Sequence, residues 1–182
     1  MNRKFVISDL HLGHKNILSY ANGLRGGTTA KEHDEWIIHQ WNSVVTKHDL
    51  VYVLGDVAMD KESLGLVKKL QGTKHLVKGN HDTESIQRYN QYFGAIYGAY
   101  NYKGTFWMTH VPIHPSSLRG MINLHGHTHQ NCVKLMDGSI DLNYINCSVE
   151  VSYGVPQNLD DLLKKYWPIV VENKKRRRGE IS

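Results

Sequence analysis

The sequence predicts an α/β fold, a sandwich with sheets at its centre and helices outside. Two observations carry this prediction. Up to Gly94, short β-branched runs alternate with segments whose apolar residues follow helical spacing. After Gly94, short alternating runs with turn signals dominate. Strands that alternate with helices favour a layered sheet with helices packed on it.

The first half of the chain is expected to begin with a strand over residues 3–8, where KFVI is rich in β-formers. Residues 17–21 are a candidate short helix. A longer helix is expected from Thr28 or Thr29, and Glu32 would complete a capping box with Thr29. Its apolar stripe contains Trp36, Ile37, Trp41, Val44 and Val45. Further strands are expected within 49–56 and 74–82, and further helices within 61–72 and 84–94.

The second half is expected to be mostly strands, within residues 95–110, 121–129 and 132–148. The dipeptide at 137 and 138, Asp-Gly, is a turn signal inside the last of these segments. A final helix is expected from Pro156, because proline is favoured in a first helical turn.

The net charge of +5 comes from one place. The run Lys174–Arg178 carries five positive charges, and without it the chain has 17 basic and 17 acidic residues. We therefore expect one domain over residues 1–172 and a basic, disordered tail over 173–182. Such a tail could contact nucleic acid transiently.

The composition also indicates a compartment. No apolar run approaches the length of a membrane span, and the first residues lack a signal-peptide pattern. Cys132 and Cys147 are too few for a disulfide framework. We expect a cytoplasmic protein that does not associate with a membrane.

Polar side chains gather where five predicted strands end. In open α/β sheets, ligands bind beyond the carboxyl ends of the strands, so we expect these side chains to meet. Asp9 and His11 would share one face of an extended chain, as would His127 and His129. Seven nitrogen and oxygen donors are too many for one tetrahedral zinc and suit two ions with a bridging carboxylate. The seven are Asp9, His11, Asp56, Asn80, His110, His127 and His129, and His81 directly follows Asn80.

The blocks Asp-x-His, Gly-Asp, Gly-Asn-His-Asp, a lone His and Gly-His-x-His occur in this order from residue 9 to residue 129. Together they resemble the calcineurin-like metallophosphoesterases. The resemblance implies a four-layer α/β/β/α sandwich with two central mixed sheets. It implies one metal held by Asp9, His11, Asp56 and His129, and a second held by Asp56, Asn80, His110 and His127. His81 and the bridging Asp56 would serve catalysis.

The function implied is hydrolysis of a phosphate ester by a metal-activated hydroxide. Two divalent ions, two carboxylates and one hydroxide leave the site with a charge of about +1, which accepts an anion. Mn²⁺ is the preferred ion, and Fe, Zn, Ni or Co remain open. A phosphodiester or nucleotide-like substrate is favoured. The alternatives are a nuclease acting on DNA or RNA, a phosphomonoesterase or protein phosphatase, and a non-enzymatic scaffold.

The sequence departs from some relatives of this family. Serine/threonine phosphatases carry Gly-Asp-x-x-Asp-Arg-Gly, but here Met59 stands where their second Asp partners the catalytic histidine. Asp82 is not expected to replace that partner of His81. His14 and Arg25 follow the first ligands and are candidate contacts for substrate phosphate. His33 matches no block and is assigned to the surface or to a helix face. His125 either supports a ligand or only fills space in a strand.

Overall fold

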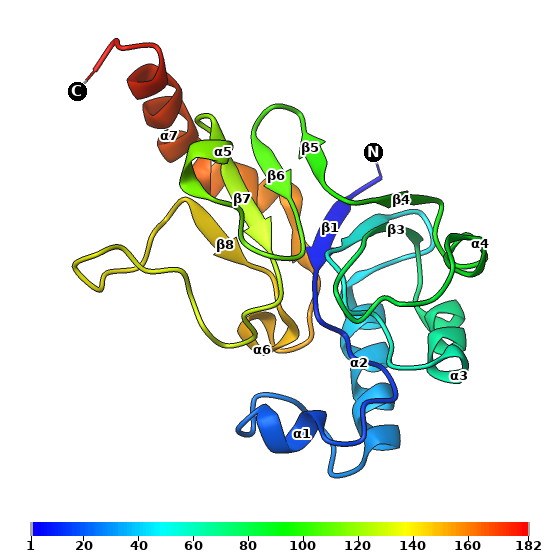
Figure 1. The fold of residues 1–182 in the computed structure, drawn as a ribbon. Helices are drawn as coiled ribbons and strands as arrows, with labels where there is room; N and C mark the ends of the chain where they lie inside the picture. Colours follow the sequence, from blue (N-terminus) through cyan, green and yellow to red (C-terminus); the bar gives the residue numbers. More distant parts are fainter. Residues whose placement is uncertain (1, 182) are drawn as a thin grey trace.

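The computed structural model describes residues 2–181 and contains two mixed β-sheets (Figure 1). The first sheet has the strand order β4-β3-β2-β1-β9. Its first four strands run parallel, and β9 pairs antiparallel with β1. The strands are β1 (Lys4–Ile7), β2 (Leu50–Val53), β3 (Thr73–Val77), β4 (Ala95–Tyr97) and β9 (Gln157–Asn158).

The second sheet has the order β5-β6-β7-β8, with β5 antiparallel to β6 and the other pairs parallel. Just beyond β1, Ser8 bridges Ser148, and its N–H donates to the carbonyl of Cys147 at 2.8 Å. The two sheets therefore meet at the carboxyl ends of β1 and β8. The predicted α/β sandwich with two mixed sheets is confirmed. The strands are β5 (Tyr100–Tyr102), β6 (Phe106–Met108), β7 (Ile122–His125) and β8 (Tyr144–Asn146).

Alternation along the first sheet divides the core into two clusters. Phe5 and Ile7 of β1 pack in the cluster that contains Trp41, whereas Val6 points into the cluster that contains Phe106 of the second sheet. Successive strand residues face opposite sides of a sheet, so both faces of β1 are buried. This double burial holds the end of β1 rigidly where Asp9 follows.

The longest helix of the first half is α2 (Ala30–Val44), and its expected capping box between Thr29 and Glu32 is confirmed. The other helices before the final helix are short, with four residues each except η1, which has five. They are α1 (Ile17–Tyr20), α3 (Lys61–Leu64), η1 (Gly65–Lys69), α4 (Ile86–Tyr89), α5 (Pro115–Leu118) and α6 (Val149–Ser152). None of the helices within residues 2–181 is long and apolar enough to cross a membrane.

The final helix, α7 (Leu159–Arg177), begins later than expected from Pro156. The side chain of Asn158 caps it by accepting from the N–H groups of Asp160 and Asp161. Gln157 and Asn158 are instead used as the edge strand β9. Tertiary pairing with β1 therefore overrides the proline signal. The Asp-Gly segment forms only one antiparallel bridge, Lys134 with Ile140, rather than two full strands.

Helix α7 also continues through the first half of the segment that we expected to be a disordered tail, up to Arg177. An ion pair between Arg176 and Glu172 spans one turn at 2.9 Å, and Arg177 donates to the carbonyl of Arg119 at 3.0 Å. Basic side chains near a helix C-terminus are also favoured by the helix dipole. The basic run is therefore helical and contacts the rest of the domain.

A buried carboxylate joins the start of β1 to the loop before β2. Asp49 is buried, pairs with Arg3 at 2.7 Å, and accepts from the N–H and hydroxyl of Thr46 at 2.8 Å. These hydrogen bonds, that with Arg3 foremost, hold the pKa of Asp49 well below its usual range. A depressed folded-state pKa adds stability above the unfolded-state pKa of about 4, and this stability is lost as the pH falls below that value.

We therefore expect Asp49→Asn to lower the free energy of unfolding at pH 7 by about 2 kcal/mol, since hydrogen bonds to a charged group are lost. Arg3 is half exposed, so water screens its share of this effect. The difference from wild type should shrink below about pH 4. Urea unfolding across pH values measures it, with the exposed Glu35→Gln as the control. A difference that is constant with pH would contradict the ion pair's role.

Candidate metal centre

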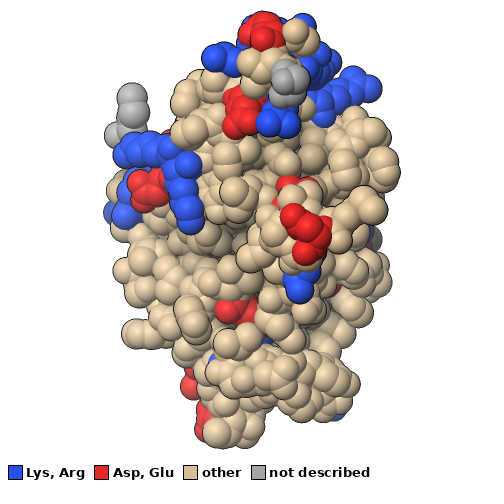
Figure 2. Space-filling model, turned by 90° about the vertical axis from the view of Figure 1, so that its left-hand side faces the viewer, with Lys and Arg blue, Asp and Glu red and all other residues tan. Residues whose placement is uncertain are grey.

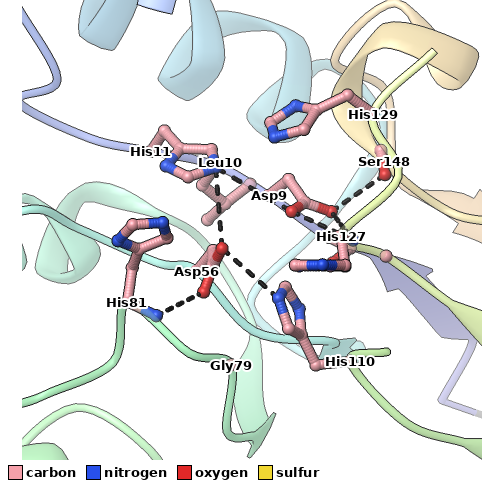
Figure 3. A network of polar contacts seen from close by, with 12 residues as sticks. Asp9, Leu10, His11, Asp56, Gly79, His81, His110, His127, His129 and Ser148 are labelled. Carbon is pink, nitrogen blue, oxygen red and sulfur yellow. Dashed lines mark hydrogen bonds and ion pairs between the residues drawn. The ribbon is translucent and has the colours of Figure 1, made fainter. Parts of the chain in front are cut away.

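The eight predicted side chains lie in loops that follow β1, β2, β3, β6 and β7. Figure 3 shows the carboxylates of Asp9 and Asp56 at the centre, with histidine rings from both sheets around them. These loops meet because the two sheets join at Ser8 and Ser148. Segments up to 120 residues apart in the chain thus form one site.

The first group contains Asp9, His11 and His129, whose ligand atoms all lie within 4.8 Å of one another. Nε2 of His11 is 3.8 Å from Oδ1 of Asp9. The His11 and His129 rings stack with centroids 5.2 Å apart. One carboxylate and two imidazoles are donors that divalent transition metals accept.

The second group contains Asp56, His110 and His127, again within 4.8 Å of one another. Asn80 belongs to it, because its Oδ1 lies 2.8 Å from Nε2 of His110 and 3.0 Å from Nδ1 of His127. Burial alone would lower the pKa of His110, but the adjacent Asp56 carboxylate raises it. The donor atoms of four different loops therefore lie close together.

Asp56 lies between the two groups. Its Oδ2 is 3.8 Å from Nε2 of His11 and 3.3 Å from Nε2 of His110. Burial would raise the pKa of this carboxyl, but the hydrogen bond and charge of His110 outweigh burial and lower it to about 2. Asp56 is thus ionised at neutral pH and lies close to a histidine of each candidate group, the position that a shared ligand requires.

His11 provides a test of whether the site fits metal ions. Both of its ring nitrogens are buried and find no hydrogen-bond partner among the described residues. Burial, the largest cause, lowers the pKa of His11 to about 3, so its ring is neutral and able to donate an electron pair. Buried polar atoms normally have a hydrogen-bond partner or a ligand. A metal between Asp9 and Asp56 would give Nε2 of His11, which faces both carboxylates, such a partner. The residues present fit the expected ions.

The backbone of the ligand loops differs from what we expected. Asp9 (φ 60°), His11 (φ 50°) and Asp56 (φ 54°) are left-handed, as are His127 and His129. The prediction that the two residues of each pair share one face of an extended chain is therefore wrong, because the backbone at these residues is left-handed. Left-handed backbone in non-glycine residues is unfavourable and is concentrated at functional sites.

Two glycines beside the ligands are required for close approach. A Cβ on Gly79 would collide with Oδ1 of Asp56, and one on Gly126 would collide with Ser8 and Asp9. Because glycine has no side chain, the loop after β3 can touch the loop after β2, and the loop after β7 can touch the loop after β1.

Three buried residues that support the ligands were not recognised in the sequence. Asp82 accepts from the N–H groups of Asp56, Val57 and Gly79 at 2.8–3.0 Å. Ser148 donates to Oδ2 of Asp9 at 2.9 Å. Glu150 accepts from Nδ1 of His129 at 2.8 Å. Asp82 was visible beside His81, but Ser148 and Glu150 have no local signal because their partners are far away in the chain.

Arg25 is not placed for the substrate contact that we expected. Its buried guanidinium donates to Glu150 at 2.8 Å and to the carbonyls of Asp9 and Leu10 at 2.7 and 3.1 Å. His33, which we expected at the surface or on a helix face, lies in α2, where it is buried and contacts Arg25. Arg25 therefore orders the loop that carries the first ligands and does not face substrate.

His14 and His81 do line an open pocket over the ligands, with a volume of about 550 Å³. The His81 ring is 5.7 Å from that of His11, and the backbone N–H of His81 donates to Oδ1 of Asp56 at 2.9 Å. No carboxylate within the described residues forms a hydrogen bond with the His81 ring, in line with Met59 in place of an aspartate. His125 is buried, with Nδ1 2.8 Å from the carbonyl of Gly126, and its side chain forms no hydrogen bond with the seven candidate ligands.

The family model for the calcineurin-like phosphoesterases matches residues 3–179. The chain belongs to this family. The sequence resemblance is thereby confirmed over nearly the whole chain, and the structure adds two groups of candidate metal ligands. Membership of this family supports hydrolase activity on a phosphate ester.

Two relatives align over almost all of this phosphoesterase. The uncharacterized protein MJ1445 of Methanocaldococcus jannaschii is 33% identical over 175 residues, which cover 90% of this chain and 91% of that protein. The crystal structure of AQ665 from Aquifex aeolicus, a protein of unknown function, has a TM-score of 0.68 and 25% identity, and covers 90% of this chain and 99% of that one. A nuclease MPE from Pseudomonas putida shares the fold with a TM-score of 0.50 and 18% identity, over 76% and 66% of the two chains.

Glu150 supplies a prediction about this phosphoesterase. Glu150→Gln should weaken Mn²⁺ binding by about 10- to 100-fold, because partners that orient a metal-binding histidine usually have effects of this size. His129 would keep an acceptor but lose the charge that orients it. Calorimetric titration with Mn²⁺ measures the change, with the exposed Glu62→Gln as the control. Unchanged affinity in Glu150→Gln would contradict this role.

Proposed function

We propose that this phosphoesterase is a two-metal phosphodiesterase acting on a nucleotide-like substrate. The observation that carries the proposal is the pair of ligand groups that share Asp56 beneath an open pocket. Asp9, His11, Asp56 and His129 would hold one ion, and Asp56, Asn80, His110 and His127 the other. When bound, the ions would ionise a water and stabilise the charge that develops on phosphate oxygens. Mn²⁺ is our preferred ion, and the donor set also suits Fe, Zn, Ni or Co.

The pocket supports a diester over a monoester. Of the ten described residues that line it, none is Lys or Arg. A phosphomonoester is a dianion near neutral pH, whereas a diester carries one negative charge. Without a fixed cation in the pocket, the second charge of a monoester has no partner beyond the ions. The lining provides neutral polar and aromatic groups instead: Tyr20, Thr128, Gln130 and Asn131 among them.

Two histidines of the pocket receive roles in this proposal. His81 is exposed beside Asp56 and would give a proton or hydrogen bond to the leaving oxygen. His14 packs between His11 and Tyr20, with ring centroids 5.6 and 6.2 Å away, and would contact the substrate next to the reacting phosphate. Its Nδ1 already accepts from the N–H of Asn16, so Nε2 is the atom turned to a ligand.

The test compares a diester and a monoester that release the same aryl alcohol, with Mn²⁺ present. We expect kcat/KM to be higher for the diester. Comparing kcat/KM for cyclic nucleotides and single-stranded oligonucleotides then shows which groups on either side of the phosphate the enzyme accepts. A higher kcat/KM for the monoester would contradict the diester preference. Absence of hydrolysis of every ester would favour the non-enzymatic scaffold.

A nuclease is the second candidate, since nucleic acid is itself a phosphodiester. The observation that favours it is the basic end of α7, which lies outside the pocket described above. Oligonucleotide hydrolysis in the same series, faster than that of small diesters, would decide for it.

A further inference from the structure

A second hollow of about 590 Å³ lies where the end of α7 meets the β5–β6 turn and the loop after α5. It shares no residue with the pocket over the metal ligands. Four of its seven lining residues are cationic and none is acidic. We call these four, Arg119, Lys174, Arg177 and Arg178, the basic surface.

The fold builds the basic surface from two separate segments. Lys174, Arg177 and Arg178 follow the i, i+3, i+4 spacing that places side chains on one face of a helix. Arg177 donates to the carbonyl of Arg119 at 3.0 Å, which fixes that face against the loop. A Cβ on Gly120 would lie 3.4 Å from the Lys174 backbone, so the loop and helix are in close contact. The cations are thus held together by the domain rather than spread along a free tail.

The charge on this surface is mostly uncompensated. Arg178 pairs with Glu180 at 2.9 Å, but the side chains of Arg119 and Lys174 form no hydrogen bond or ion pair within residues 2–181. Figure 2 shows Lys and Arg gathered around the end of α7, with acidic side chains among them, while much of the face below it carries no charged side chain. Since the chain outside Lys174–Arg178 has equal numbers of basic and acidic residues, the positive potential is local.

We propose that the basic surface binds the phosphate backbone of nucleic acid. Lys and Arg clustered along a helix are the usual electrostatic footprint of such binding. The guanidinium of Arg119 can pair with a phosphate through two hydrogen bonds, and Lys174 adds a point charge beside it. The hollow is open at the molecular surface, which suits an extended polyanion that passes across it. This binding goes beyond the proposed hydrolysis and does not use the metal centre.

The experiment measures binding of a fluorescent single-stranded oligonucleotide to the full chain in EDTA, which stops hydrolysis. Salt is varied between about 50 and 200 mM, because each phosphate contact adds about 0.7 to the slope of log K against log salt for single strands. The double variant R119Q/K174Q should reduce that slope by about 1.4 and the affinity at 0.1 M salt by roughly 25-fold. The matched control is K164Q/K165Q, which removes two lysines from the first half of α7.

Equal slopes for R119Q/K174Q and wild type would overturn the inference, and so would an equal loss in K164Q/K165Q. Vesicles that contain phosphatidylserine form a second arm. Binding to these vesicles but not to the oligonucleotide would assign the surface to a membrane and reject nucleic acid. The Asp56→Asn variant separates the two proposals, since it should bind the oligonucleotide as wild type does. If no diester is hydrolysed but R119Q/K174Q still changes the salt slope, only the proposed function fails.

Discussion

Asp56→Asn is expected to reduce phosphoesterase turnover by about 10³-fold or more, a loss at the upper end of that for one electrostatic contact. The reason is that Oδ2 of Asp56 faces both His11 and His110, so this one substitution weakens both ligand groups. An amide there provides one neutral oxygen where two ions require a charge. Activity with Mn²⁺ and the number of ions bound per chain measure the effect.

The same variant has a thermal readout that does not depend on activity. The pKa of Asp56 lies below its usual value, so its charge stabilises the fold, and Asp56→Asn should lower the melting temperature of the metal-free protein. Each protein is therefore compared with and without Mn²⁺. Mn²⁺ should raise the melting temperature of wild type, because it binds the folded state, but not that of Asp56→Asn. Asp161→Asn, exposed on α7, is the control. A metal-dependent rise that persists in Asp56→Asn would reject its bridging position.

His81→Ala is expected to lower kcat by about 10²- to 10⁴-fold while Mn²⁺ affinity stays within a small factor of wild type. His81 lines the pocket and touches Asp56 only through its backbone, so the alanine variant keeps that hydrogen bond. The metal ligands are thereby left in place. Steady-state kinetics and calorimetric titration together measure this split.

The leaving group distinguishes proton donation from a merely structural role. A diester with a poor, alkyl leaving group needs a proton more than one with a good, aryl leaving group. His81→Ala should therefore lose more activity on the alkyl diester. The exposed His39→Ala serves as the control. An equal loss on both esters, or full turnover with both metals bound, would exclude His81 as the proton donor.

Most of the ligand set could be predicted because each block carries its own local signal. Gly55 and Asp56, or Gly126 and His127, combine a strand end, a glycine and a donor within a few residues. The order of these blocks then identifies the family. The helix α2 was equally visible, because its capping box and apolar stripe are local features.

What could not be predicted depends on contacts between distant residues. Arg25 looked like a phosphate contact because it is a cation in a polar loop, but burial against Glu150, 125 residues away, gives it another role. The left-handed backbone at Asp9 and His11 likewise comes from the tertiary meeting of two sheets. The helical end of α7 depends on Arg119, which no sequence pattern connects with Arg177.

The distance in sequence between the ligands also has a kinetic consequence. The loops that carry Asp9 and His129 come from different sheets. Asp9 accepts a hydrogen bond from Ser148, and His129 donates one to Glu150. Neither sheet alone can form a complete ion site, so the centre arises only after the slow, non-local steps of folding. Metal added during refolding should leave the folding rate unchanged and slow only unfolding. An ion in this centre should therefore bind only after the native topology has formed, and it should then lengthen the lifetime of the folded state.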